Sequence, residues 1–162
     1  METLDKFDVA ILGQLQQDAR LTNAELAQRV GLSAAPCWRR VRALEQAGFI
    51  LGYRAEIDRR KIGLGVLAFV RLDADRNTGG VTRAMEEAIR QIPEVVSCHY
   101  ISGTGTFELQ VVARDLDSFS QFARDVLLNL PNVKDMHTSF SLGEVKASGA
   151  LPLAHLTALK SR

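Results

Sequence analysis

The stretch LTNAELAQRVGLSAAPCWRRVRALEQAGFI, residues 21–50, has the spacing of two helices joined by a tight turn. The first helix is expected at residues 23–30, where apolar residues recur at helical spacing. Thr22 or Asn23 can cap it, because a short side-chain oxygen accepts a hydrogen bond from a free N–H group of the first turn. Gly31 is expected to end it, since glycine adopts the left-handed conformation without steric cost.

The second helix is expected at residues 34–46, with Ser33 as N-cap and Pro36 in the first turn, where a missing N–H costs nothing. One face has helical spacing and is predicted to pack inward: Cys37, Val41, Leu44 and Gly48. A rotation of about 100° per residue puts another set on the outer face: Ala35, Arg39, Arg42 and Gln46. Small residues near its start would let this helix enter a groove N-terminus first, as a helix-turn-helix does.

The outer face allows two interpretations. The simpler is a charged, solvated face on an ordinary helical hairpin. Arginine also pairs with phosphates or guanine edges, and glutamine with adenine, which predicts a surface for double-stranded DNA. The glycine turn, the capping serine and a predicted wing of two short strands, at 49–51 and 53–57, favour DNA binding. The candidate contacts are Thr22, Asn23, Ser33, Ala34, Ala35, Pro36, Trp38, Arg39, Arg42, Gln46 and Arg54.

The motif GLSAAPCWRRVRALEQAGFILGY, residues 31–53, closely resembles the Lrp/AsnC family, the feast/famine transcriptional regulators of bacteria and archaea. The resemblance extends over nearly the whole chain. It implies a sequence-specific regulator whose C-terminal module has a ferredoxin-like fold, dimerises and senses small molecules, most often amino acids. It also implies higher assembly, with four dimers forming an octamer.

The chain has 162 residues and a formal net charge of +1, so DNA binding has to depend on local charge. Residues 33–46 carry three arginines against Glu45, a net charge of +2. Such a modest charge predicts that two or more copies of the helix act together, since affinity grows with the number of phosphates neutralised. Cys37 and Cys98 lack metal-ligand spacing and are expected to be reduced thiols. No apolar run is long enough to span a membrane, and we expect a cytoplasmic protein.

The predicted fold class is α+β, an N-terminal winged helix-turn-helix followed by a ferredoxin-like βαββαβ sandwich. The predicted boundaries are 1–57 for the DNA-binding domain, 58–63 for a linker, 64–145 for an effector-binding and oligomerisation domain, and 146–162 for a tail. The basic linker is either solvated or a phosphate contact through Arg59, Arg60 or Lys61.

The second domain is predicted from a change of period at residue 64. Strands are expected at 64–73, 95–102, 106–114 and 133–142, with helices at 79–91 and from Asp115 or Asp117 onward. The first strand looks apolar on both faces, while two helices can cover only one face of the sheet. The uncovered face predicts a dimer through the sheets.

The hairpin Tyr100–Phe107 is the predicted effector site, because its glycines and hydroxyls can present N–H and O–H groups to a small ligand. A simple turn is the plainer interpretation. The resemblance implies an effector at this loop, between dimers, but the family pattern S-G-D-x-D-Y has acidic residues where this chain has Thr104 and Thr106. We therefore expect an amino acid or other carboxylate, held chiefly by its carboxylate group. The candidate residues are Ser102, Gly103, Thr104, Gly105, Thr106, Met136 and Thr138.

No catalytic set is recognisable, so the chain is not expected to be an enzyme and no cofactor is implied. His99 and His137 are expected on adjacent strands, but no metal site is predicted, because no acidic or cysteine partner has ligand spacing. The preferred function is an oligomeric DNA-binding transcriptional regulator modulated by a small effector. The alternative is a metabolite-sensing module with weak or vestigial DNA binding.

Overall fold

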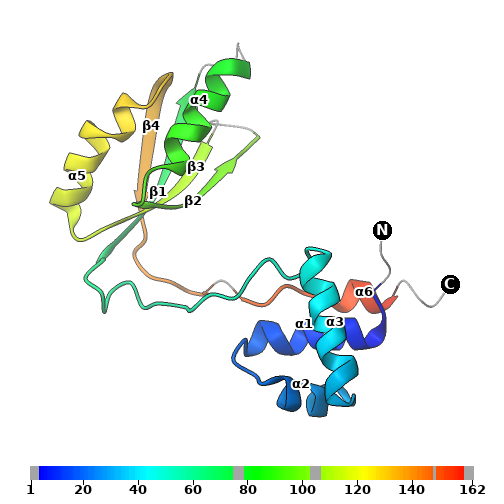
Figure 1. Ribbon diagram of the computed structural model, residues 1–162. Coiled ribbons are helices and arrows are strands. Elements are labelled where there is room, and N and C mark those ends of the chain that lie inside the picture. The colour runs from blue at the N-terminus through cyan, green and yellow to red at the C-terminus, as the bar shows by residue number, and fades with distance from the viewer. Residues whose placement is uncertain (1–3, 75–78, 103–106, 148, 159–162) are drawn as a thin grey trace. The chain divides into compact units, whose positions relative to one another are not determined.

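The computed structural model describes residues 4–74, 79–102, 107–147 and 149–158 (Figure 1). The chain divides into two units. The head unit comprises Met1–Glu56 together with Lys146–Arg162, and the sheet unit comprises Ile57–Val145. None of the described helices has the length and apolar character needed to cross a membrane.

Three helices of the head unit, α1 (Lys6–Gln17), α2 (Asn23–Val30) and α3 (Ala34–Gln46), pack around one small core. Each helix contributes to this core, whose buried members are Ile11, Leu26, Ala27, Cys37 and Leu44. The helix-turn-helix predicted at residues 23–46 is therefore confirmed. Val41 is only half-buried and Gly48 is exposed, so the predicted packing stripe is shorter than expected and ends at Leu44.

The C-terminal segment of the head unit packs on α1. The short helix α6 (Ala154–Ala158) lies against α1, and Leu153 approaches Gly13. The side-chain amide of Gln16 forms hydrogen bonds with both backbone groups of Leu151, accepting from its N–H at 2.6 Å and donating to its carbonyl at 3.3 Å. The chain therefore begins and ends in the same unit.

The two strands predicted for the wing, at 49–51 and 53–57, do not form. Residues 50–58 contain no strand, although apolar and polar residues alternate there. Alternation favours an extended backbone, but a strand also needs a neighbouring strand, and none of the described strands pairs with this segment. Residues 47–65 instead form a connector between α3 and the first strand.

The sheet unit has the predicted βαββαβ order. Its strands are β1 (Val66–Ala74), β2 (Val95–Tyr100), β3 (Phe107–Ala113) and β4 (Val133–Phe140), and its helices are α4 (Gly79–Arg90), α5 (Leu116–Asp125) and a short 3-10 turn at Leu127–Asn129. The strands form one antiparallel sheet in the order β2-β3-β1-β4. Both helices contribute to one core with the sheet, and the ferredoxin-like fold is confirmed (Figure 1).

The sheet face away from this core, here called the open face, is only partly apolar. Ala68, Val70, Leu72 and Ala74 alternate toward the core. On the open face Leu67 and Phe69 are followed by the charged Arg71 and Asp73, so the expectation of an apolar strand on both faces holds only for the first half of β1. Arg71 forms an ion pair of 3.0 Å with Glu108, its cross-strand neighbour on β3.

Ionised carboxylates stabilise the starts of α1 and α2. Asp5 caps α1 by accepting from the N–H groups of Phe7 and Asp8, and Glu25 of α2 accepts from the backbone N–H and hydroxyl of Thr22. Desolvation opposes ionisation of Asp5, but those two N–H groups and Arg40 outweigh it and lower its pKa. Hydrogen bonds from Thr22 lower the pKa of Glu25.

We therefore expect acid to destabilise the head unit. A carboxylate with a lowered folded-state pKa contributes stability above its unfolded-state pKa of about 4 and loses it as the pH falls through the folded value. The free energy of unfolding should be level above about pH 5 and fall below about pH 4. Urea denaturation followed by circular dichroism at pH 3–7 measures this, and Asp5→Asn should flatten the dependence. An unchanged profile in that variant would contradict the assignment to Asp5.

Candidate nucleic-acid interface and effector module

The turn between α2 and α3 fixes the angle at which α3 leaves the core. Gly31 has φ 72° and ψ 35°, and the N–H of Leu32 then donates to the carbonyl of Ala27 at 2.9 Å. This geometry needs glycine, since other residues are strained at that φ. The amide of Asn23 donates to the carbonyl of Ala34 at 2.8 Å and so joins the starts of both helices.

The predicted contacts at the helix starts are already engaged within the head. Thr22 forms a capping box with Glu25, and the Asn23 amide is bonded to Ala34. Ser33 occupies the N-cap position of α3 as predicted, but its side chain makes no capping hydrogen bond. Ser33, Ala34 and Ala35 are exposed, while Pro36 is half-buried. The start of α3 thus presents small residues to solvent.

The outer face of α3 carries the predicted polar residues. Arg39, Arg42 and Gln46 are exposed, as is Trp38, whereas Cys37 and Leu44 are buried on the opposite side. Within the described part of the chain, Arg39 makes no hydrogen bond or ion pair. Arg42 forms an ion pair of 3.2 Å with Glu45. The two arginines therefore differ in how freely they can move.

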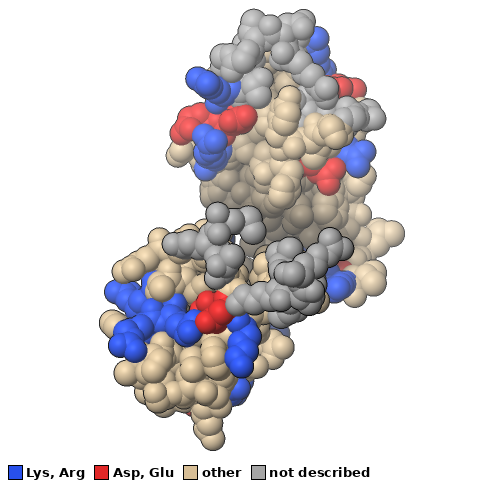
Figure 2. All heavy atoms as spheres, turned by 90° about the vertical axis from the view of Figure 1, so that its right-hand side faces the viewer, with Lys and Arg blue, Asp and Glu red and all other residues tan. Residues whose placement is uncertain are grey.

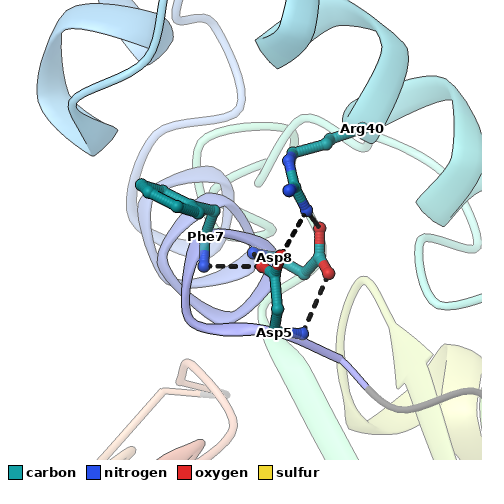
Figure 3. A network of polar contacts seen from close by, with 4 residues as sticks. All are labelled: Asp5, Phe7, Asp8 and Arg40. Carbon is teal, nitrogen blue, oxygen red and sulfur yellow. Dashed lines mark hydrogen bonds and ion pairs between the residues drawn. The ribbon is translucent and has the colours of Figure 1, made fainter.

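The third arginine of α3 serves the fold. Arg40 turns toward the start of α1, where its Nη1 lies 2.8 Å from Asp5 and 2.7 Å from Asp8 (Figure 3). Its guanidinium also lies 5.5 Å from the centre of the Phe7 ring. The net charge of +2 predicted for residues 33–46 includes Arg40, whose charge the two carboxylates offset.

The basic residues that follow α3 also differ in whether their side chains are engaged within the protein. Arg54 is exposed, but it lies in the connector and not on a wing. Arg59 donates to the carbonyls of Leu64 and Gly65, both at 2.9 Å, so its guanidinium closes a turn of the connector. Figure 2 shows Lys and Arg side chains gathering on one face of the head unit around a small acidic cluster.

Among the candidate effector residues that the structure describes, Ser102 is not brought together with Met136 and Thr138. Gly103, Thr104, Gly105 and Thr106 lie outside the described residues. Ser102 is exposed and follows β2, while Met136 and Thr138 are half-buried on β4, next to the core residues Leu72 and Val70. Strands β2 and β4 are the opposite edges of the sheet. Ser102 therefore follows one edge strand, while Met136 and Thr138 lie on the other.

The expected placement of the two histidines is wrong. His99 on β2 and His137 on β4 are separated by β3 and β1. They end one cross-strand row on the open face, in which His99 is paired with Glu108, Glu108 with Arg71, and Arg71 with His137. In the described ranges, no three His, Cys, Asp or Glu side chains come together as a metal ion would require.

Sequence reasoning missed the partners of the α3 arginines. Arg42 and Glu45 have the i,i+3 spacing that places side chains together on a helix, so this pair could have been predicted. The contact of Arg40 with Asp8 joins residues 32 positions apart and leaves no local signal.

Comparisons with known proteins agree with this architecture. A family model described as the Lrp/AsnC ligand binding domain matches residues 67–151, and one described as winged helix-turn-helix DNA-binding matches residues 4–50. The leucine-responsive regulatory protein of Escherichia coli (strain K12) is 37% identical over 148 residues, which cover 91% of this chain and 90% of that protein.

Two solved structures extend the comparison. A transcriptional regulator from Neisseria meningitidis, solved as an L-Met complex, has a TM-score of 0.90 and 41% identity, covering 95% of this chain and 99% of that one. An AsnC family transcriptional regulator from Agrobacterium tumefaciens has a TM-score of 0.88 and 31% identity, covering 94% and 99%. The chain therefore belongs to the Lrp/AsnC family of DNA-binding transcriptional regulators.

Proposed function

We propose that α3 is the element that reads double-stranded DNA, with Arg39 and Arg42 as its principal contacts. The observation that carries this is the exposure of both arginines opposite the buried Cys37 and Leu44, on a helix whose first turn is small and solvent-facing. Gln46, Trp38 and the start of α3 at Ser33–Pro36 complete the contact surface. Arg54 reaches phosphate from the connector.

Variants of the three α3 arginines test this proposal. Arg39→Ala and Arg42→Ala should each cost about 1–3 kcal/mol of specific binding if the residue contacts a base. A phosphate contact should instead weaken binding to all sequences alike and reduce the salt slope by about 1. Arg40→Ala is the matched control, because it removes the same charge from the same helix at a position bound to Asp5 and Asp8. Equal losses in all three variants would contradict the assignment.

The DNA for this experiment is the region upstream of the gene that encodes the protein, compared with random-sequence DNA over a range of salt concentrations. A regulator should prefer the specific fragment at every salt concentration. A salt-dependent affinity that is equal for both fragments would instead favour the metabolite-sensing module with weak DNA binding. Sequencing of genomic fragments retained by the protein would then identify the operator.

The working form is proposed to be a homodimer that joins through the open faces and assembles further, with four dimers giving an octamer. Leu67 and Phe69 support this proposal, because they lie on the open face, where Val112 is the cross-strand neighbour of Leu67. The small free charge of α3 also favours several heads acting together, since linked sites gain affinity by effective concentration.

The effector is proposed to be an amino acid or another small carboxylate, bound between subunits. The L-Met complex of the regulator from Neisseria meningitidis, at 41% identity, makes methionine the first candidate. Thr104 and Thr106 cannot pair with an ammonium group by charge, so the carboxylate and side chain of the effector should provide most of the affinity.

Calorimetry with L-methionine, L-leucine and simple carboxylates tests the effector site, using wild type and Thr106→Ala. We expect binding that the substitution weakens, and a change in assembly or DNA affinity that follows from different affinities for the two states. Binding that is indifferent to Thr106→Ala would place the site elsewhere.

A further inference from the structure

A chain of polar contacts links the connector to the outer face of α3. The Tyr53 hydroxyl donates to Oε1 of Glu45 at 3.1 Å. The other carboxylate oxygen, Oε2, accepts from Nη1 of Arg42 at 3.2 Å. The Arg42 guanidinium lies 5.8 Å from the centre of the Trp38 ring. One carboxylate is therefore held from both sides, by a connector residue and by a candidate DNA-reading arginine.

The four side chains share one surface hollow of about 290 Å³ beside α3. In the ion pair between Arg42 and Glu45, the Glu45 side chain is 28% exposed and the Arg42 side chain 58%. Desolvation and the neighbouring Glu45 carboxylate raise the pKa of Tyr53, so its hydroxyl remains a donor at neutral pH. The hydrogen bond and the ion pair can therefore persist together at neutral pH.

We propose that Glu45 and Tyr53 are positioning residues that determine how Arg42 reads DNA. The pair orients the Arg42 guanidinium and offsets part of its charge, so that Arg42 discriminates between sequences and does not simply bind any phosphate. This inference rests on the proposed role of α3. Tyr53 lies in the connector. A change in the connector that moves Tyr53 would therefore alter how Glu45 holds Arg42, and with it the discrimination between DNA sequences.

The Glu45 charge and the Tyr53 hydroxyl group should have separable effects on DNA binding. Removing the Glu45 charge releases Arg42 as a free cation that is available to phosphate. Each additional phosphate contact steepens the slope of log affinity against log salt by about 0.9. Removing only the Tyr53 hydroxyl leaves the charges unchanged, but Oε1 of Glu45 loses its hydrogen bond. Discrimination should then fall while the salt slope stays the same.

Glu45→Gln tests the charge, with Glu87→Gln as its matched control. Glu87 forms a similar i,i+3 pair with Arg90, at 3.0 Å on α4 of the sheet unit. In Glu45→Gln we expect affinity for random DNA to rise about two- to fivefold and the salt slope to steepen by about 0.9 per head. The ratio of specific to random affinity should fall. Glu87→Gln should leave all three quantities at wild-type values.

Tyr53→Phe tests the anchor, because it removes only the hydroxyl group that donates to Glu45 and leaves every charge in place. We expect the specific-to-random ratio to fall about two- to fivefold at an unchanged salt slope. Trp38, the single tryptophan, provides a second readout, since a loosened Arg42 should leave its ring more open to acrylamide quenching. Melting temperatures should stay close to wild type, because Tyr53 is 47% exposed.

The outcomes separate this inference from the role of α3. If Arg39→Ala and Arg42→Ala bind DNA as wild type does, the proposed role of α3 fails. If those variants lose binding while Glu45→Gln and Tyr53→Phe keep wild-type ratios, slopes and quenching, the inference about Glu45 and Tyr53 is wrong. A loss of specific and random affinity in equal proportion, with a lower melting temperature, would also overturn it by showing a purely structural role.

Discussion

Leu44→Asp is expected to unfold the head unit and to leave the sheet unit folded. Leu44 is 4% exposed and belongs to a core of five buried residues. Loss of a buried leucine costs about 2–5 kcal/mol, and an unpaired buried carboxylate adds several more. This cost should exceed the free energy of unfolding of the head unit, because domains with so small a core are only marginally stable. DNA binding should be lost completely.

Thermal unfolding and amide exchange measure this result. The sheet unit has its own core, so its strand amides should stay protected while those of α1, α2 and α3 exchange freely. Leu51→Asp is the matched control, because it makes the same change in the head unit at a side chain that is 96% exposed. Simultaneous loss of protection in both units would show that they fold as one.

If the proposed dimer forms through the open faces, Phe69→Asp is expected to convert it into monomers and to reduce DNA affinity by roughly 10²- to 10⁴-fold. Phe69 lies on the open face beside Leu67, on the half of β1 that lacks charged side chains. A carboxylate there would be buried in a sheet-to-sheet interface without a partner. Separated heads lose the effective concentration that linkage provides, which is the source of the large expected loss.

Light scattering at micromolar concentration gives the assembly state, and a DNA titration gives the affinity. Leu116→Asp is a suitable control, because Leu116 is 57% exposed and lies on α5, away from the open face. Circular dichroism should show both variants folded. An assembly that survives Phe69→Asp would place the dimer interface on another surface.

The helix-turn-helix was predictable because its signals are local. Thr22 and Gly31 determine where α2 begins and ends, each through contacts within a few residues. The sheet was predictable in element order for the same reason, since each strand and helix has its own period. The order of strands in a sheet depends on pairing between distant segments, which periodicity does not reveal. The wrong prediction that His99 and His137 lie on adjacent strands is an example.

The prediction of two wing strands was wrong for a related reason. Leu51, Tyr53, Ala55 and Ile57 alternate with polar residues and favour an extended backbone, but the pattern says nothing of a partner. At the candidate site, helical spacing identified the outward arginines correctly. The internal binding of Arg40 depends on carboxylates of α1 that only the folded head brings near.

The return of the tail to α1 makes the sheet unit an insertion within the head. Both ends of the inserted segment are tied to the same body, because Glu56 precedes it and Lys146 follows it. A fragment that ends before residue 146 would lack the contacts of Leu151 and Leu153 with α1, so a fragment that keeps the whole head unit is discontinuous in sequence.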